Sequence, residues 1–541
     1  MALRRLFKLS SILAWSSLGS STPLGHRFPC SSNSFNFPEI FGANATDISA
    51  SPVSNYTTFS LAPGSNVAGT YTINFCNVTV TYTHPGWGDS ITVHVSLPAA
   101  SLWNGRLQAL GGGGYSASFG ALYSTQAVSL GYVTIDTDAG HVQGAEAAQS
   151  PESWALTSSG NVNLYLLENF GSRSLHEMAV IGKAVTASYY GSQPQYSYFT
   201  GCSGGGRQAL MIAQRYAEDF DGILATAPAI NFENFIPAGY WATQVMHDLG
   251  VFPSPCEFKA FTEAAIAACD KLDGVIDGII GLPELCTFDP HTVVGQSFAC
   301  DNFTQQFTEP GATIVEAAWT GPKNDNGRVG WFGLNKDAAL DSYIITQYIL
   351  NGTCAASSSP LVSSYLQYLL VKDPNWDPST MTKEDFFNYL RQSQRDYDSP
   401  LGAANPDLSA FRRKGGKMIS WHGLADDAIP PNGTIAYYEK VLKLDSKAGD
   451  FFRVYEAPGV AHCFGGTGPS PDGALDQLIS WVENGVAPET LTAVSASGYT
   501  RSLCAYPLQQ IYLGGSITDS SSFGCAPRAE VGTPASEAPF F

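Results

Sequence analysis

Alternating polar and apolar positions predict strands in the N-terminal third of the chain. Residues 71–98 alternate in this way, most regularly over 92–97. A period of two is typical of a half-buried strand, because successive side chains point to opposite faces. Short runs at 106–110 and 131–136 predict two further strands, and the first of these leads into four consecutive glycines.

The clearest pattern follows this region. A β-rich run at 195–200 leads into a glycine turn, a helical pattern at 207–220 and a second β-rich run at 222–227. The apolar residues of the helical stretch recur on one side, as in an amphipathic helix. A strand, a helix and a second strand in this order form a βαβ unit and imply a parallel sheet.

The alternation of strand and helix patterns stops over residues 231–407, which are dense in cysteines, glycosylation sequons and loop residues. Strand patterns return at 417–421 and 451–455, and a helical pattern at 474–484. We therefore predict an α/β domain with a large insertion that forms a lid. The predicted parts are an α/β domain made of 23–230 and 408–541, and a lid domain at 231–407.

The charge of the chain excludes two classes of partner. The chain has 541 residues and a formal net charge of −19 at pH 7. An acidic surface is repelled by nucleic acid and by anionic membranes, so we expect neither as a partner.

Residues 1–22 have the features of a secretory signal peptide. A basic start at Arg4, Arg5 and Lys8 precedes an apolar run at 9–18 and then small residues. The apolar run is much shorter than the roughly 20 residues that a membrane span needs. Six sequons also favour a secreted, extracellular glycoprotein. They are Asn44, Asn55, Asn77, Asn302, Asn351 and Asn432.

The eleven cysteines predict several disulfide bonds, because thiols of secreted proteins are mostly oxidised. Their odd number leaves at least one thiol free or paired with another chain. No CxxC pair is present, which argues against a zinc ribbon or a thioredoxin-type site. Cys202 precedes Ser203, and Cys463 follows His462, so two cysteines lie beside residues that could perform nucleophilic catalysis.

Ser203 is the candidate nucleophile. Residues 201–205 satisfy the pattern Gly-x-Ser-x-Gly between a predicted strand and a predicted helix. The glycines are needed because the serine occupies a strained turn in which bulky neighbours would clash. One alternative is a glycine-rich turn with an exposed serine. Another is Cys202 as nucleophile, although a cysteine with a partner beside the base is expected to be bridged.

A serine nucleophile needs a base and a carboxylate that orients the base. In α/β-hydrolases the order along the chain is Ser, then Asp or Glu, then His. His462, in a loop after a predicted strand, is the candidate base, and His422 is the second choice. Asp426 and Asp427 both follow the strand ending at 421, and spacing alone does not choose between them.

The candidate oxyanion hole combines two backbone N–H groups. Gly204 follows the nucleophile, and the glycines at 111–114 provide the second donor from an early loop. We favour Gly113, with Gly114 almost equal to it. The alternative is that these glycines form only a flexible turn.

Five motifs together resemble one family of secreted fungal hydrolases. They are GCSGGGRQ at 201–208, GGK at 415–417, HGLAD at 422–426 with IPP at 429–431, GVAHC at 459–463 and RSLCAYP at 501–507. In this order, and across nearly the whole chain, they are similar to the tannase and feruloyl esterase family, most closely to its feruloyl esterase B members. The resemblance implies the α/β-hydrolase fold and makes Asp426 the acid, because Asp427 falls where other members often have proline.

The resemblance also implies four disulfide bonds and a structural calcium site. The implied pairs are Cys202–Cys463, Cys30–Cys76, Cys269–Cys286 and Cys504–Cys525. Cys256, Cys300 and Cys354 do not fit the expected pattern, and Cys300 lacks a near partner in the sequence. The implied Ca²⁺ ligands are the carboxylates of Asp270, Asp273 and Asp277 and the carbonyl oxygens of Val275 and Ile279. Hard oxygen ligands of this kind suit Ca²⁺ and not zinc.

The implied activity is hydrolysis of carboxylic esters through an acyl-enzyme, without an organic cofactor. The implied substrates are phenolic esters, and we favour hydroxycinnamic acids such as ferulate, released from plant cell-wall polysaccharide or from small esters. A tannase acting on gallate esters would share every motif. A serine carboxypeptidase would need an acidic recognition element that the sequence does not offer. An inactive hydrolase-fold glycoprotein would be expected to lack a member of the triad, yet Ser203, Asp426 and His462 are all present.

Overall fold

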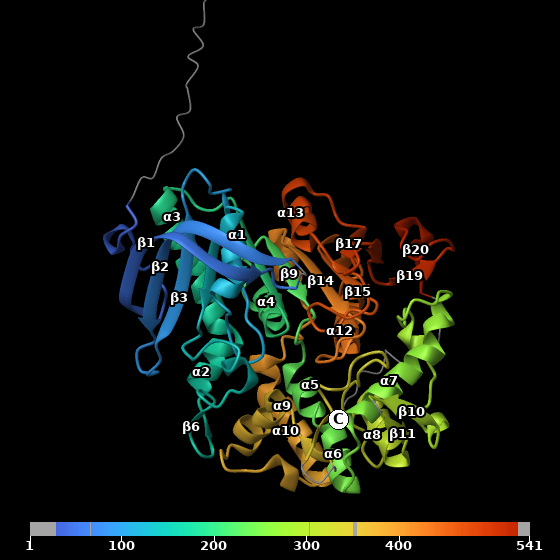
Figure 1. Ribbon diagram of the computed structural model, residues 1–541. Helices are drawn as coiled ribbons and strands as arrows, with labels where there is room; N and C mark the ends of the chain where they lie inside the picture. The colour runs from blue at the N-terminus through green and yellow to red at the C-terminus, as the bar shows by residue number, and fades with distance from the viewer. Residues whose placement is uncertain (1–28, 65–66, 302, 350–353, 529–541) are drawn as a thin grey trace, which may run out of the picture.

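The computed structural model describes residues 29–64, 67–301, 303–349 and 354–528. The predicted signal peptide and the sequons at Asn302 and Asn351 lie outside these residues. Figure 1 shows an α/β part in the upper half of the view and a mainly helical part below it. No helix among the described residues is long and apolar enough to cross a membrane.

A nine-stranded sheet forms the centre of the α/β part. In spatial order its strands are β1 (Asn44–Leu61), β2 (Ala68–Thr83), β3 (Ile91–Pro98), β5 (Val133–Thr137), β4 (Arg106–Leu110), β8 (Tyr196–Cys202), β9 (Gly222–Thr226), β14 (Lys417–Gly423) and β15 (Phe452–Ala457). The first four strands pair antiparallel, and every pairing from β5 to β15 is parallel. This mostly parallel sheet confirms the predicted α/β-hydrolase fold.

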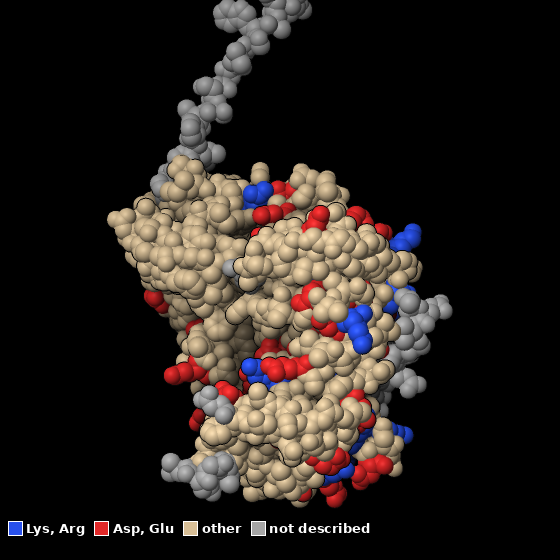
Figure 2. Space-filling view, turned by 45° about the vertical axis from the view of Figure 1, so that its right-hand side comes forward, with Lys and Arg blue, Asp and Glu red and all other residues tan. Residues whose placement is uncertain are grey.

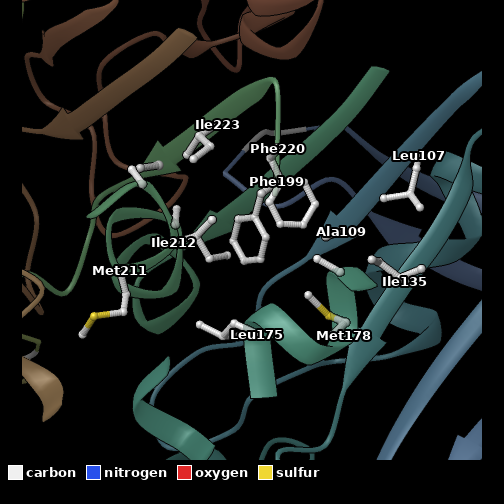
Figure 3. Close-up of a cluster of buried hydrophobic side chains, with 14 of the residues drawn as sticks. Leu107, Ala109, Ile135, Leu175, Met178, Phe199, Met211, Ile212, Phe220 and Ile223 are labelled. Carbon is white, nitrogen blue, oxygen red and sulfur yellow. The ribbon is translucent and has the colours of Figure 1, made fainter. Parts of the chain in front are cut away.

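Helices cover both faces of the parallel strands. On one face, α3 (Ser174–Tyr190), α4 (Gly204–Arg215) and α12 (Pro431–Leu444) contribute to the largest apolar cluster. On the other, α1 (Ala121–Ser129) and α13 (Ala474–Asn484) pack against residues that alternate with these along the strands. Figure 3 shows Phe199 of β8 and Ile223 of β9 near Ile212 of α4 in the first cluster. Because both faces are covered, the central parallel strands β5, β4, β8, β9 and β14 are buried along nearly their whole length and show no alternation of buried and exposed positions.

The strand predictions hold better for the buried strands than for the exposed ones. The predicted run at 71–98 is a hairpin of two strands, β2 and β3, with a turn between them. The sequence patterns missed β1, because 17 of its 18 positions are exposed or half-buried in a mixed order that gives no period of two (the one buried position, Ser60, lies near its end). The helix predicted at 207–220 begins earlier and ends earlier, as α4.

The segment between β9 and β14 lies outside the sheet. Its helices are α5 (Phe232–Ala238), α6 (Trp241–Leu249), α7 (Pro255–Cys269), α8 (Glu309–Thr320), α9 (Pro360–Ser364), α10 (Lys383–Leu401) and α11 (Ser409–Lys414). Two small hairpins accompany them, β10 (Ser297–Cys300) with β11 (Phe303–Gln306) and β12 (Ile345–Tyr348) with β13 (Cys354–Ser357). Apolar residues of this segment form a cluster with Tyr115, Trp154 and Phe170 of the α/β part, so the two parts share a packed contact.

Smaller elements complete the chain. Before α3 they are β6 (Leu156–Ser158), β7 (Asn161–Val162), α2 (Leu164–Glu168) and a π-helical turn at Asn169–Arg173. After β15 they are β16 (Ser470–Pro471), β17 (Thr490–Val494), β18 (Thr500–Cys504), β19 (Leu508–Tyr512) and β20 (Phe523–Pro527). The face of the molecule that Figure 2 shows is hollowed between its upper and lower halves, and both acidic and basic side chains lie on the rim of the hollow.

Five disulfide bonds link the described residues. Four are the pairs that the resemblance implied: Cys30–Cys76, Cys202–Cys463, Cys269–Cys286 and Cys504–Cys525. The fifth, Cys256–Cys300, joins two of the three cysteines that did not fit the expected pattern. Its cysteines are 44 residues apart in sequence, and packing of α7 beside β10 brings them together. Cys354 is the free cysteine of the described residues.

Candidate active site

Ser203 occupies the turn between β8 and α4. Its backbone has φ 61° and ψ −122°, a conformation that costs a non-glycine residue free energy and is found at nucleophile turns. The neighbouring glycines are required sterically: a Cβ on Gly201 would lie 2.5 Å from the carbonyl group of Gly205, and one on Gly205 would lie 2.8 Å from the Gly112 oxygen. The sequence therefore places the serine at the carboxyl end of a central parallel strand.

The two other predicted residues come from the next two strands of the sheet. Asp426 follows β14, and His462 follows β15. His462 Nδ1 lies 2.8 Å from Asp426 Oδ2. In the neutral ring Nδ1–H donates to the carboxylate, which leaves the Nε2 lone pair available to accept a proton. His462 and Ser203 line the same cavity.

Asp426 is buried and accepts four hydrogen bonds. Its Oδ1 accepts the backbone N–H groups of Ala428, at 2.8 Å, and Ile429, at 2.7 Å. Its Oδ2 faces the rings of His462, at 2.8 Å, and His422, at 3.0 Å. Burial alone would raise the pKa of Asp426, but the neighbouring His462 and the hydrogen bonds outweigh it and hold the pKa well below its usual range. Asp426 therefore stays ionised in the site.

The carboxylate also sets the basicity of His462. Burial lowers the pKa of the imidazole, whereas the charge of Asp426 and its hydrogen bond raise it, and the net pKa lies above the usual 6.5. The charge of Asp427 acts in the same direction. A pKa near neutrality suits a general base.

The two alternative residues of the sequence analysis have other contacts. His422 is fully buried on β14 and does not line the cavity, whereas the His462 side chain is 22% exposed and does. Asp427 accepts the backbone N–H of His462 at 3.2 Å and the hydroxyl of Ser342 at 2.9 Å. Asp427 thus connects the histidine loop to the inserted segment, and Asp426 contacts the ring.

The glycine loop at 111–114 lies against the nucleophile turn. The N–H of Gly113 is donated to the Ser116 carbonyl at 3.1 Å. The N–H groups of Gly114 and Gly204 have no acceptor among the described residues. The geometry therefore favours Gly114 over Gly113 as the second oxyanion donor. At φ 54° a Cβ on Gly114 would lie 2.0 Å from the Ala148 oxygen, so this position requires glycine.

A cavity of about 330 Å³ opens in front of these residues. The inserted segment supplies one wall, with Phe232, Phe235 and Ile236 of α5 and Leu361 and Val362 of α9. A mainly apolar cavity with a few polar groups is typical of small-molecule sites. Sequence reasoning did not place these wall residues; the apolar run directly after β9 was the available signal.

The disulfide between Cys202 and Cys463 joins the nucleophile turn to the histidine loop. The Cα atoms of the two cysteines are 6.0 Å apart, although 261 residues separate them in the sequence. Each cysteine also lines the cavity. The bond therefore fixes the backbones beside Ser203 and His462 relative to each other.

A model of the family described as tannase and feruloyl esterase matches residues 76–526. The chain belongs to the tannase and feruloyl esterase family. By family it is a carboxylic ester hydrolase. Among its curated relatives, a probable feruloyl esterase of Arthroderma benhamiae is 43% identical over 466 residues, which cover 84% of this chain and 86% of that protein.

Solved structures of the family superimpose on this chain. The tannin acyl hydrolase from Aspergillus niger gives a TM-score of 0.83 at 28% identity and covers 92% of this chain and 95% of its own. The feruloyl esterase B from Aspergillus oryzae gives 0.74 at 26% identity, with 90% and 98% covered. The family resemblance predicted from the five motifs is confirmed.

Within this esterase, Arg207 links the nucleophile helix to its surroundings. The side chain is fully buried, and its two terminal nitrogens donate to the carbonyls of Phe170 and Gly171, each at 3.0 Å. Its guanidinium carbon lies 4.6 Å from the ring centroid of Phe170 and 5.9 Å from that of Phe232. Burial lowers the pKa of Arg207 to about 9. Arg207 lies in the family motif at 201–208, but sequence reasoning gave it no role.

The predicted calcium residues lie together in the loop after α7. Asp270 accepts the backbone N–H groups of Asp277 and Gly278, each at 3.0 Å, and Asp277 pairs with Arg501 at 2.8 Å. Burial and the charges of Asp277 and Asp270 raise the pKa of Asp273 to about 6. In this arrangement the described residues include no group of three or more His, Cys, Asp or Glu side chains set to hold a metal ion.

Proposed function

We propose that this chain is a secreted serine esterase that releases hydroxycinnamic acids of the ferulate type from plant cell-wall esters. The observation that carries the proposal is the arrangement of Ser203, His462 and Asp426 at the carboxyl ends of three parallel strands, around one cavity. Family membership supports the ester bond as the target.

The proposed reaction is a two-step acyl transfer. Nε2 of His462 takes the proton of Ser203 as the serine oxygen bonds to the ester carbonyl carbon. The backbone N–H groups of Gly204 and Gly114 stabilise the oxyanion. The protonated His462 then gives its proton to the departing alcohol, which leaves an acyl-enzyme. Water then attacks the acyl carbon while His462 takes its proton. His462 returns that proton to the serine oxygen as the acyl–oxygen bond breaks, which releases the acid and restores the free serine.

The inserted segment, 231–407, is proposed to act as the lid that selects the acyl group. Its helix α5 presents Phe232 and Phe235 to the cavity, and aromatic walls favour a flat aromatic acid. The 43% identity to a probable feruloyl esterase favours ferulate. The higher TM-score with the tannin acyl hydrolase favours the second candidate, a tannase acting on gallate esters.

The experiment that separates these candidates compares methyl ferulate, methyl caffeate and methyl gallate at matched concentrations. The proposal predicts the highest kcat/KM on methyl ferulate. A higher kcat/KM on methyl gallate would make the chain a tannase, and no hydrolysis of any phenolic ester would contradict the proposed substrate class.

Secretion is supported by the five disulfide bonds, which persist in oxidising compartments. Of the sequons within the described residues, Asn44, Asn55 and Asn432 are exposed and Asn77 is half-buried. Expression of the full chain with its own N-terminus tests the proposal: active, glycosylated protein should accumulate in the medium, and retention inside the cell would contradict it.

We also propose that the loop at 270–279 binds Ca²⁺ as a structural ion. The support is its donor set, because each carboxylate oxygen that accepts an N–H has a second lone pair for a cation. The ion would be held by Asp270, Asp273 and Asp277 with carbonyls of Val275 and Ile279. Chelator treatment should lower Tm, and added Ca²⁺ but not Mg²⁺ should restore it. An unchanged Tm, together with no bound calcium by elemental analysis, would refute the site.

A further inference from the structure

His422 is a buried histidine beside the proposed catalytic residues. It lies on β14, four positions before Asp426, and both side chains are fully inaccessible to solvent. The sequence made it the second candidate for the base. Its ring instead contacts Oδ2 of Asp426, and His422 does not line the cavity.

Two contacts fix the proton on one ring nitrogen. Nε2 of His422 lies 3.0 Å from Asp426 Oδ2 and 3.1 Å from the carbonyl oxygen of Ile429. Neither acceptor carries a hydrogen, so Nε2 carries one and donates it. Nδ1 lies 2.8 Å from Oγ1 of Thr434, in the first turn of α12. The threonine hydroxyl can donate to Nδ1 and complete a neutral, Nε2-protonated imidazole.

We propose that Thr434 and His422 are positioning residues of the esterase reaction, which act through a hydrogen-bond chain from Thr434 to His422 to Asp426. The chain ends on Oδ2, the same oxygen that receives Nδ1–H of His462. Thr434 directs the His422 ring, and His422 holds the carboxylate toward the base. The inference rests on the proposed function, because it assigns these roles relative to His462.

The physical effect follows from the number of acceptor sites. A carboxylate has about four lone-pair positions, and all four of Asp426 are used, two on each oxygen. Without the N–H donor of His422, the Asp426 carboxylate loses one of the four hydrogen bonds that stabilise its negative charge. The carboxylate then attracts the His462 imidazolium more strongly and raises the pH at which His462 becomes a free base.

Other charged and titratable groups near the chain of hydrogen bonds are accounted for. Asp427 acts on His462 from the same loop as Asp426, and Tyr343 of the inserted segment donates to the Ala428 carbonyl at 3.2 Å. Glu456 is the neighbour of His422 across β14 and β15 and is paired with Arg528 at 2.6 Å. Asp426 is thus the charged group that His422 contacts.

The test measures kcat/KM for a phenolic methyl ester as a function of pH in the full-length secreted enzyme. His422→Leu removes the donor, and His422→Gln keeps an N–H donor at a similar reach. In the leucine variant, the fall of kcat/KM on the acid side of the pH profile (the acid limb) should move to higher pH by about one unit. The variant should also lower kcat more than it changes KM. The glutamine variant should return the limb toward its wild-type position.

A second pair of variants tests the chain where the leucine variant does not fold. Thr434→Val removes the hydroxyl at nearly constant volume and should shift the acid limb in the same direction by a smaller amount. Thr434→Ser should rescue the wild-type limb. The proposal would be overturned if His422→Leu and Thr434→Val both lowered activity without shifting the acid limb of the pH profile. Where His422→Leu cannot be obtained, the same result for Thr434→Val alone would overturn it. Either result would leave these residues a packing role. Wild-type and Ser203→Ala enzymes run in the same assay show separately whether the proposed serine esterase activity exists.

Discussion

Cys202 and Cys463 form a disulfide bond that joins the turn of the proposed nucleophile, Ser203, to the loop of His462. The bond closes a loop of 261 residues, for which the chain-entropy estimate is about 5 kcal/mol of stability, as an upper figure. Its position matters more for the chemistry, because proton transfer requires the serine and histidine side chains to stay within hydrogen-bond reach.

The double variant Cys202→Ser, Cys463→Ser should lose most esterase activity at temperatures at which it is still folded. The reason is that the two loops are no longer fixed to each other. Activity and circular dichroism recorded on the same samples check this. The matched control is Cys504→Ser, Cys525→Ser, which removes a disulfide away from the cavity and should lower Tm with little effect on kcat. A folded, fully active variant lacking Cys202 and Cys463 would refute the role of this bond.

Asp426 and Asp427 form a matched pair for testing which carboxylate serves the base. Asp426→Asn should lower kcat by about 10³- to 10⁴-fold, because the hydrogen bond that orients His462 is lost. Asp427→Asn should cost far less, since Asp427 contacts only the backbone of His462 and the Ser342 hydroxyl. Steady-state kinetics of both variants decide the matter, and equal losses would contradict the assignment.

The pH dependence of the wild-type enzyme should report His462. The imidazole must be neutral to accept the serine proton, and its pKa lies above the usual 6.5 because of Asp426. The value of kcat/KM should therefore fall as the pH drops through a pKa higher than that of a free histidine. A profile that stays flat down to about pH 5 would be inconsistent with His462 as the base.

Glu233 makes stability depend on pH in the neutral range. This carboxyl is buried on α5, and burial raises its pKa from 4.5 to about 8, with one oxygen that has no hydrogen-bond partner. In the unfolded chain the group ionises near its ordinary pKa, whereas in the folded protein it stays neutral. The folded state therefore loses stability relative to the unfolded state as the pH rises from 4.5 toward 8.

Glu233→Gln cannot ionise, so its advantage in Tm over the wild type should be larger at about pH 7.5 than at about pH 5. Thermal unfolding at the two pH values checks this. Glu218→Gln, at an exposed position, serves as the control and should show no such difference. The same Tm advantage at both pH values would show that Glu233 is ionised in the folded protein.

The sequence predicted the parts of the molecule that depend on local pattern. The buried parallel strands and the turn at Ser203 follow from apolar runs and from glycines that the backbone requires sterically. The motif resemblance supplied Asp426 over Asp427, a choice that spacing left open. The sequence could not decide whether Gly113 or Gly114 is the oxyanion donor. The two differ in a tertiary detail: the N–H of Gly113 is donated to the Ser116 carbonyl, whereas that of Gly114 has no acceptor among the described residues.

Other features depend on contacts between distant segments. The bond between Cys256 and Cys300 needs α7 beside β10, and the contact of His422 with Asp426 needs the loop after β14 to turn back on its strand. The wall of the cavity is formed by α5 and α9. The first of these helices ends at Ala238 and the second begins at Pro360, 122 positions later, and neither has a periodicity that points to a cavity. Patterns along the chain carry no information about such tertiary neighbours.

The most direct test of the account is the rate of methyl ferulate hydrolysis by the secreted wild-type enzyme and by Ser203→Ala. We predict that the variant folds with a Tm close to that of the wild type and that its kcat falls by about 10⁴-fold or more. Retained turnover by a folded Ser203→Ala enzyme would contradict the proposed mechanism.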